Sequence, residues 1–225
     1  MFLHHKLIPQ FDVDSLINAS FYHMTPKFQG FAESHDFWEI IYACKNNVVC
    51  HVENNIKTLK QGEMIFIKPN DEHYIKTTND DTNVFIISFS THSKAMTAFN
   101  DKVIPIKRDL ERYIYRIIEE SKETFDIPIS DPHITKMEFK ENATIGGLQV
   151  IKNYLEILLI EIMRFEANKN NTDTVFLIKE KYKNNLSGEI IHYLNNNIYN
   201  KVNIDDIEKK LHYNKSYIFK KFKEQ

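Results

Sequence analysis

The sequence predicts an α+β protein in which an antiparallel β-barrel comes first and helices follow. Up to about residue 100, short apolar runs are separated by turns rich in asparagine, glycine and proline. This pattern is typical of an antiparallel sandwich or barrel. From residue 106 onward, apolar residues recur at the spacing of amphipathic helices.

The composition limits the classes of function that this chain can have. With 225 residues the chain can bury a good core and fits one large or two smaller domains. A formal net charge of −2 means that any affinity for DNA must come from a local basic patch. No apolar run approaches the length of a membrane span, so we expect a cytoplasmic protein without a membrane partner. Cys44 and Cys50 form no CxxC pair, which indicates reduced thiols but leaves a hairpin disulfide open.

The expected strands are short and each is bounded by turn residues. Pro69, for example, ends a buried strand, and Asn46 lies in a turn between two strands. The segments that we expect to be strands are 38–44, 48–52, 56–59, 64–67, 73–75 and 83–89.

Two long helices are expected after the barrel. The first begins near residue 106 and reaches Ser121, with an apolar stripe that includes Leu110 and Ile114. The second, residues 148–167, is apolar on more than one face. Such a helix requires burial on two sides, so we expect it to pack on the barrel and to form a homodimer. An internal core helix is the alternative.

The C-terminal residues predict three short helices. Asn203 and Asn214 stand where N-caps are favoured, just before the second and third helices. Two short helices joined by a tight break, with a basic outer face on the second, are typical of a helix-turn-helix that enters the DNA major groove. A small helical tail with a solvated basic face is the simpler alternative.

This segment resembles the first helix-turn-helix of AraC/XylS-type transcription regulators. Two positions depart from the family pattern: Glu208 replaces a small alanine, and Lys221 replaces an aliphatic residue. The family carries two such motifs, whereas this sequence ends at Gln225, so we expect a fragment or a short form with weak or absent DNA binding. The matching residues are Ile204, Ile207, Leu211, Tyr213, Tyr217, Ile218, Phe222 and Lys223.

The β half resembles a cupin barrel and also the effector domain of the same regulators. The resemblance rests on the run from His35 to Glu39 and on Gly62-Glu63, Pro69 and His73. It implies a cupin-like effector-binding barrel in 1–105, a helical dimerisation segment in 106–168, a linker in 169–185 and a first helix-turn-helix in 186–225.

The histidines of the barrel leave three interpretations open. His35, Glu39 and His73 could supply metal ligands, but Glu33 stands where enzymatic cupins carry a further histidine. The histidines could also close the barrel by hydrogen bonds, or contact an organic effector. We predict no metal and no cofactor, and a small-molecule effector bound by His35, Trp38, Glu39, Tyr42, Cys50, His73 and Tyr74.

No nucleophile elbow, zincin motif or Walker loop is present in the sequence, so we predict no enzymatic activity. The predicted function is a ligand-responsive, sequence-specific DNA-binding transcription regulator. The alternatives are a metal-dependent cupin oxygenase or isomerase and an effector-binding or dimerisation module that does not bind DNA. In the regulator, Lys215, Ser216 and Lys220 would face base edges, and phosphates would be contacted by Lys209, Lys210 and Lys223.

Overall fold

The computed structural model divides the chain into two compact units, Pro9–Met163 and a second unit of Met1–Ile8 with Arg164–Gln225. Two hydrophobic cores lie in the first unit, and a smaller cluster lies in the second. The residues that the structure describes are 4, 7–100, 102–127, 136–169, 190, 203–211 and 213–223.

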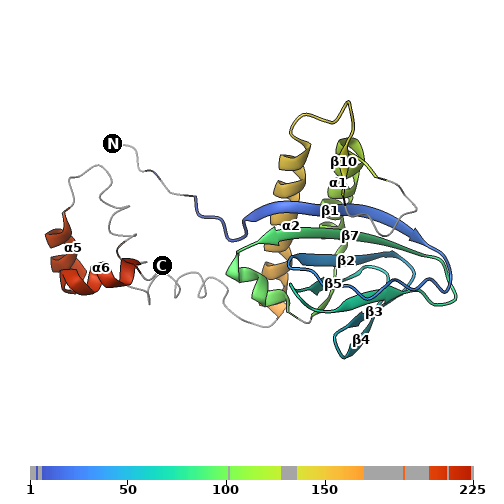
Figure 1. Ribbon diagram of the computed structural model, residues 1–225, viewed down its shortest axis with the longest axis horizontal. Helices are drawn as coiled ribbons and strands as arrows, with labels where there is room; N and C mark the ends of the chain where they lie inside the picture. The colour runs from blue at the N-terminus through green and yellow to red at the C-terminus, as the bar shows by residue number, and fades with distance from the viewer. Residues whose placement is uncertain are drawn as a thin grey trace. The chain divides into compact units, whose positions relative to one another are not determined.

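Two antiparallel sheets form the β half of the first unit (Figure 1). The larger sheet has the order β1-β7-β2-β5-β8 and the smaller has the order β4-β3-β6. The larger sheet consists of β1 (Val13–Met24), β2 (Trp38–Lys45), β5 (Glu63–Ile67), β7 (Thr82–Thr91) and β8 (Val103–Pro105). The smaller consists of β3 (Val48–Val52), β4 (Asn55–Leu59) and β6 (His73–Lys76).

Several turns between these strands need a left-handed backbone. Asn46 and Asn70 have φ values of 58° and 69°, and Gly62 has a φ of 85°. Asparagine and glycine adopt this conformation at the lowest cost, which explains the turn composition seen in the sequence.

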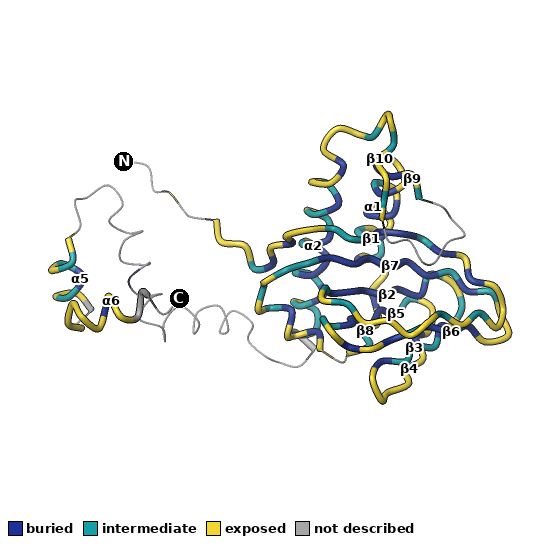
Figure 2. The backbone as a smooth tube through the Cα atoms, in the orientation of Figure 1, coloured by how far each residue is buried: buried dark blue, intermediate teal, exposed yellow. Residues whose placement is uncertain are grey.

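The larger sheet is buried on both faces, as the dark central strands of Figure 2 show. In β2, Trp38, Ile40 and Tyr42 belong to the core shared with the helices, whereas Ile41 and Ala43 belong to the core shared with the smaller sheet. The side chains of a strand alternate between its faces, so β2 contributes to both cores.

Helices cover the face of the larger sheet that is turned away from the smaller one. Helix α1 (Arg108–Thr124) and helix α2 (Gly147–Lys169) bury their apolar residues against this sheet. Between them, β9 (Phe125–Asp126) and β10 (Glu138–Phe139) pair as a short ribbon. A 3₁₀ helix, η1 (Lys94–Phe99), adds Met96 and Phe99 to the same core.

In the second unit, α5 (Ile204–Leu211) and α6 (Lys215–Lys223) pack around Ile190, Ile207 and Ile218. The linker predicted for 169–185 lies outside the described residues apart from its first residue. The first helix predicted for the C-terminal segment also lies outside them, except at Ile190.

The six strands predicted from the sequence are confirmed as β2 to β7, and the two long predicted helices are confirmed as α1 and α2. Strands β1, β8, β9 and β10 were not predicted individually. Within the described part of the chain, no helix combines the length and the apolar character that a membrane crossing requires.

Candidate functional site

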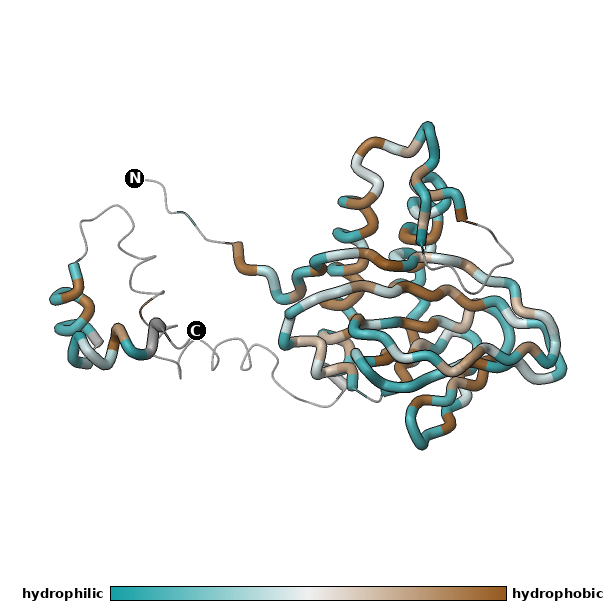
Figure 3. Tube along the Cα trace, in the orientation of Figure 1, coloured by the Kyte–Doolittle hydropathy of each residue, from teal (hydrophilic) through white to brown (hydrophobic). Residues whose placement is uncertain are grey.

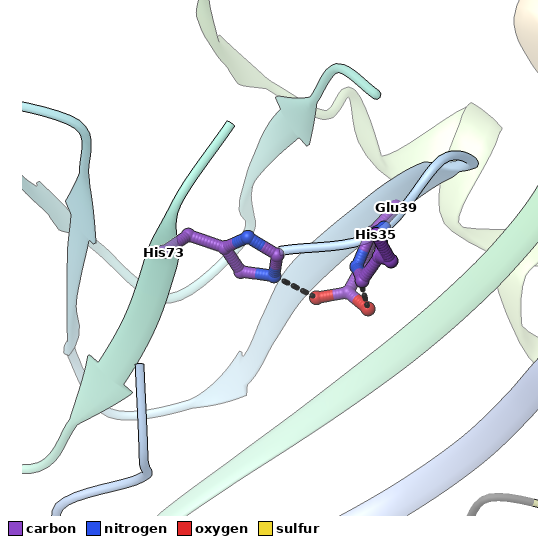
Figure 4. Close-up of side chains that lie close together, drawn as sticks. All are labelled: His35, Glu39 and His73. Atoms are coloured by element: carbon purple, nitrogen blue, oxygen red, sulfur yellow. Dashed lines mark ion pairs between the residues drawn. The ribbon is translucent and has the colours of Figure 1, made fainter. Parts of the chain in front are cut away.

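His35, Glu39 and His73 come together at one end of the space between the two sheets (Figure 4). One nitrogen or oxygen atom from each side chain lies within 4.8 Å of the others. Glu39 belongs to β2 of the larger sheet and His73 to β6 of the smaller one, while His35 precedes β2. Three segments that are separate in the sequence therefore meet in one cluster.

Backbone hydrogen bonds hold the two histidine segments together. The amide of Glu33 donates to the carbonyl of His73 at 2.9 Å, and the amide of His73 donates to the carbonyl of Glu33 at 2.9 Å. The amide of Asn70 also donates to the carbonyl of His35 at 2.7 Å. These bonds hold the backbones of the two histidine segments next to each other.

Each histidine also has a fixed tautomer in its neutral form. The Nδ1 atom of His35 lies 3.0 Å from the carbonyl oxygen of Phe37, and the Nδ1 atom of His73 lies 2.9 Å from that of Asp71. A carbonyl oxygen can only accept, so Nδ1 must carry the proton and donate it. In the neutral imidazoles the Nε2 atoms therefore present lone pairs, as metal-binding histidines do.

Both Nε2 atoms point toward the carboxylate of Glu39. They lie 3.6 Å from it in His35 and 3.4 Å from it in His73, distances at which a hydrogen bond to the carboxylate is long. The Ser88 hydroxyl donates to Oε2 of Glu39 at 2.9 Å. Two lone pairs that face a buried carboxylate repel it unless a proton or a cation lies between them.

The pKa values reflect this arrangement. Burial alone would raise the pKa of Glu39, but hydrogen bonding and charge from His35 and His73 lower it to about 2. Burial would lower the pKa of His73, yet the hydrogen bond and the charge of Glu39 raise it. In the absence of a metal ion, a protonated His73 therefore faces an ionised Glu39 at pH values between the pKa of Glu39 and that of His73.

The donor set fits a transition-metal ion. Nitrogen and oxygen ligands lie about 2.0–2.2 Å from Zn²⁺ and similar ions, which places neighbouring ligand atoms roughly 3–4 Å apart. The separations of 3.6 and 3.4 Å fall in that range. The adjoining cavity of about 40 Å³ has room for an ion and a few water molecules. Oε1 of Glu33, 61% exposed, lies 3.8 Å from Nε2 of His73 at the rim.

Of the other four predicted ligand residues, Trp38, Tyr42 and Cys50 do not line the small cavity. Trp38 and Tyr42 belong to the core on the helix side of β2, and the hydroxyl of Tyr42 donates to Glu111 at 2.9 Å. Cys50 faces the inner core, where burial raises the pKa of its thiol to about 12. Tyr74 lines the small cavity and stacks on His51. Alternation along β2 places Trp38 and Tyr42 on the opposite face of the strand from Glu39.

Two residues of the site were missing from the sequence prediction. Ser88 pairs with Glu39 across β2 and β7, and Glu33 bridges to His73. Ser88 could have been recognised from the sequence, because it is a polar residue within a largely apolar strand.

The predicted DNA-binding residues lie on α5 and α6. The side chains of Lys209, Lys210, Lys215, Ser216 and Lys220 are all exposed. Lys215 in addition forms an ion pair with Asp205. Lys223 ends α6, and its side chain lies outside the described residues.

Comparison with known proteins finds similarity only among solved structures. No family model matches the chain, and no curated protein matches it. A predicted oxalate decarboxylase from Thermotoga maritima is 21% identical, with 30% of this chain and 61% of that chain covered and a TM-score of 0.29. A cupin 2 conserved barrel domain protein from Salinispora arenicola is 13% identical, with 30% and 58% covered and a TM-score of 0.29.

The DMSP lyase DddQ from Ruegeria pomeroyi is 14% identical, with 30% of this chain and 35% of that chain covered and a TM-score of 0.29. The chain therefore spans less than two thirds of the length of each of these three structures. The β half of this chain is formed by two antiparallel sheets, as described above.

The prediction that this chain is not an enzyme is wrong. It depended on the absence of catalytic motifs and on the missing histidine two residues before His35. The structure nevertheless brings together two imidazoles and a carboxylate as a set of ligands for a metal ion. Such a set is found in metalloenzymes, so missing sequence motifs do not exclude catalysis.

Proposed function

We propose that this chain is a transcription regulator of the AraC/XylS type, with an effector-binding barrel and a DNA-binding helix pair. The observation that carries the proposal is the pair α5 and α6, which residues 212–214 separate. Two short helices with this spacing have the form of a helix-turn-helix.

Both helices begin with side-chain caps. The amide of Asp206 donates to Oδ1 of Asn203 at 3.0 Å, and the amide of Asn203 donates to Oδ2 of Asp206 at 3.0 Å. This reciprocal arrangement is a capping box. The amide of Tyr217 donates to Oδ1 of Asn214 at 2.9 Å. The local sequence therefore specifies where each helix starts, which supports a defined motif over an unstructured basic tail.

The exposed cations of this motif would contact DNA. Lys209, Lys210 and Lys220 are exposed and suit phosphate contacts or base edges. Lys215 would have to exchange its ion pair with Asp205 for a DNA contact. Because an exposed ion pair contributes little free energy, this exchange has a low cost.

DNA binding tests the proposal directly. Fluorescence anisotropy with a random-sequence duplex, measured over a salt series, gives the affinity and the slope of log K against log salt. We expect the double variant Lys210→Gln, Lys220→Gln to lower the slope by about 2, because each lost phosphate contact lowers it by about 1. Lys60→Gln, at an exposed turn of the barrel, is the control. Identical slopes for the double variant and the wild type would exclude this role.

The proposal includes a homodimer formed through residues 148–167, a cytoplasmic location and the division into domains inferred from the sequence. Helix α2 supports the dimer, because two of its large apolar side chains, Leu148 and Ile157, are 47% and 40% exposed. Light scattering coupled to size exclusion would measure the assembly. A monomer at micromolar concentration would exclude this interface.

A second candidate function is a metal-dependent enzyme centred on the barrel. The observation that favours it is the cluster of His35, Glu39 and His73. A bound transition metal would supply Lewis-acid polarisation, and two histidines with one carboxylate leave further coordination positions open. The two histidines would present Nε2 to the ion, Ser88 would orient Glu39, and the small cavity would admit only a small substrate.

Elemental analysis of the purified protein tests this candidate without knowledge of the substrate. We expect about one transition-metal ion per chain, and its loss in His73→Ala. His51→Ala is the matched control, because His51 lies in β3 and stacks on Tyr74 instead of facing the cluster. Equal metal content in all three proteins would exclude the site.

A further inference from the structure

A large groove lies outside the barrel interior, between β1, the β9–β10 ribbon and the first turns of α2. Its volume is about 590 Å³, whereas the cavity beside Glu39 and His73 measures about 40 Å³. Pockets of 300–1,000 Å³ are typical of small-molecule sites. An organic ligand therefore has room in the groove that the candidate metal site does not offer.

The groove has an apolar floor and an apolar rim. Phe125, Ile151 and Leu155 form a buried floor, whereas Phe139 and Leu148 at the rim are 58% and 47% exposed. Figure 3 shows hydrophobic residues along α2 and the central strands of the larger sheet. Large apolar side chains left exposed around one hollow are typical of a binding site.

The conformation of β1 contributes to the hollow. All five residues from Val13 to Ile17 line the groove, although a regular strand would present only alternate residues. The pairing of β1 with β7 shifts register at two places in this stretch, which mark Asp14 and Ile17 as bulged positions. Bulges twist an edge strand and redirect its side chains.

The cations of the groove already have carboxylate partners. Nζ of Lys152 lies 2.6 Å from Asp12 and 3.2 Å from Glu156, and Nζ of Lys136 lies 2.6 Å from Glu138. The third charged lining residue, Asp14, is itself an anion. An anionic ligand would therefore have to displace two carboxylates from Lys152, which is 38% exposed, whereas Lys136 is 76% exposed and its screened charge would attract the ligand only weakly.

We propose that this groove binds a neutral, largely apolar organic molecule of roughly 15–25 non-hydrogen atoms, a size that suits a pocket of this class. The inference requires neither DNA binding nor a metal ion, but the groove shares Leu148, Ile151 and Leu155 with the segment that is proposed to form the dimer.

Two fluorescent probes of nearly the same shape test the inference. N-phenyl-1-naphthylamine is neutral, and 8-anilinonaphthalene-1-sulfonate carries an added sulfonate. We expect the neutral probe to bind saturably with one site per chain, and the sulfonate to bind at least about 10-fold more weakly because its charge must be desolvated.

A matched pair of variants localises the site. Leu148→Glu places a charge at the rim and should weaken the neutral probe at least about 10-fold. Ile56→Glu makes the same change in β4, at a residue that is 67% exposed and does not line the groove, and should leave binding unchanged. Circular dichroism confirms that both variants are folded.

Three results would overturn the inference. The first is the absence of saturable binding to the wild type, and the second is an equal effect of both variants. The third is a dimeric wild type that binds no probe and becomes monomeric in Leu148→Glu, which would assign the groove to a second copy of the chain.

Discussion

Replacing Glu39 by glutamine removes the buried charge that links the two histidines. The pKa of this carboxyl falls from 4.5 to about 2 in the folded protein, which corresponds to roughly 3 kcal/mol of folding free energy. A lowered carboxyl pKa contributes stability that is present above pH 4.5 and is lost as the pH falls toward 2. The raised pKa of His73 contributes stability that is present below pH 6.5 and is lost as the pH rises through the raised value.

The pH-dependent advantage of the metal-free wild type over Glu39→Gln should therefore be greatest between about pH 4.5 and 6.5. Urea unfolding between pH 3 and 8 in the presence of EDTA measures the free energy of unfolding at each pH. We expect an advantage of roughly 3 kcal/mol at its maximum, which decreases on both sides.

Glu33→Gln is the control for this experiment. Its carboxylate lies 3.8 Å from the same imidazole but is 61% exposed, so water screens its charge. The curve of this variant should follow that of the wild type. Parallel curves for wild type and Glu39→Gln would refute the reasoning, because Glu39 would then have no charge interaction with His73.

Three further changes have defined outcomes. Zn²⁺ at about 100 times its dissociation constant should raise the free energy of unfolding of the wild type by about 2.7 kcal/mol, as measured by thermal unfolding. His35→Ala should reduce this increase, whereas the control His51→Ala should keep it. Gly147→Ala should destabilise the protein by about 1–3 kcal/mol in urea unfolding, because a Cβ there would clash with the side chain of Thr124. Ile207→Ala should lower the stability of the α5–α6 pair by about 2–5 kcal/mol, and the amide hydrogens of both helices should then exchange faster. Unchanged exchange rates would contradict the small core around this residue.

Strand periodicity predicted most of the barrel but missed β1. This strand places Asn18 and Ser20 at buried positions, so its hydropathy does not alternate cleanly. The two polar side chains bond to each other, and Asn18 also donates to the hydroxyl of Tyr22 at 3.1 Å. Two register shifts further disturb the pattern. Polar groups that satisfy one another in a core cannot be recognised from a single strand.

The sequence grouped His35, Glu39 and His73 correctly, because their spacing matched a known motif. It could not separate Trp38 and Tyr42 from them, since the face on which each side chain lies depends on strand register. The short distances that make a metal ligand set depend on pairing between Glu33 and His73, which are far apart in the sequence.

Strand β2 has a consequence for how this protein can diversify. One face of the strand carries Glu39, and the other carries Trp38, Ile40 and Tyr42 against the helices. If β2 moved to adapt the site to a new ligand, its opposite face would move as well. The packing of α1 and α2 on that face would then be disturbed. Among related proteins, sequence changes that alter the ligand should therefore accumulate in the segments that line or lead into the site, such as 25–36 and 68–72. The sequence of β2 itself should stay nearly constant.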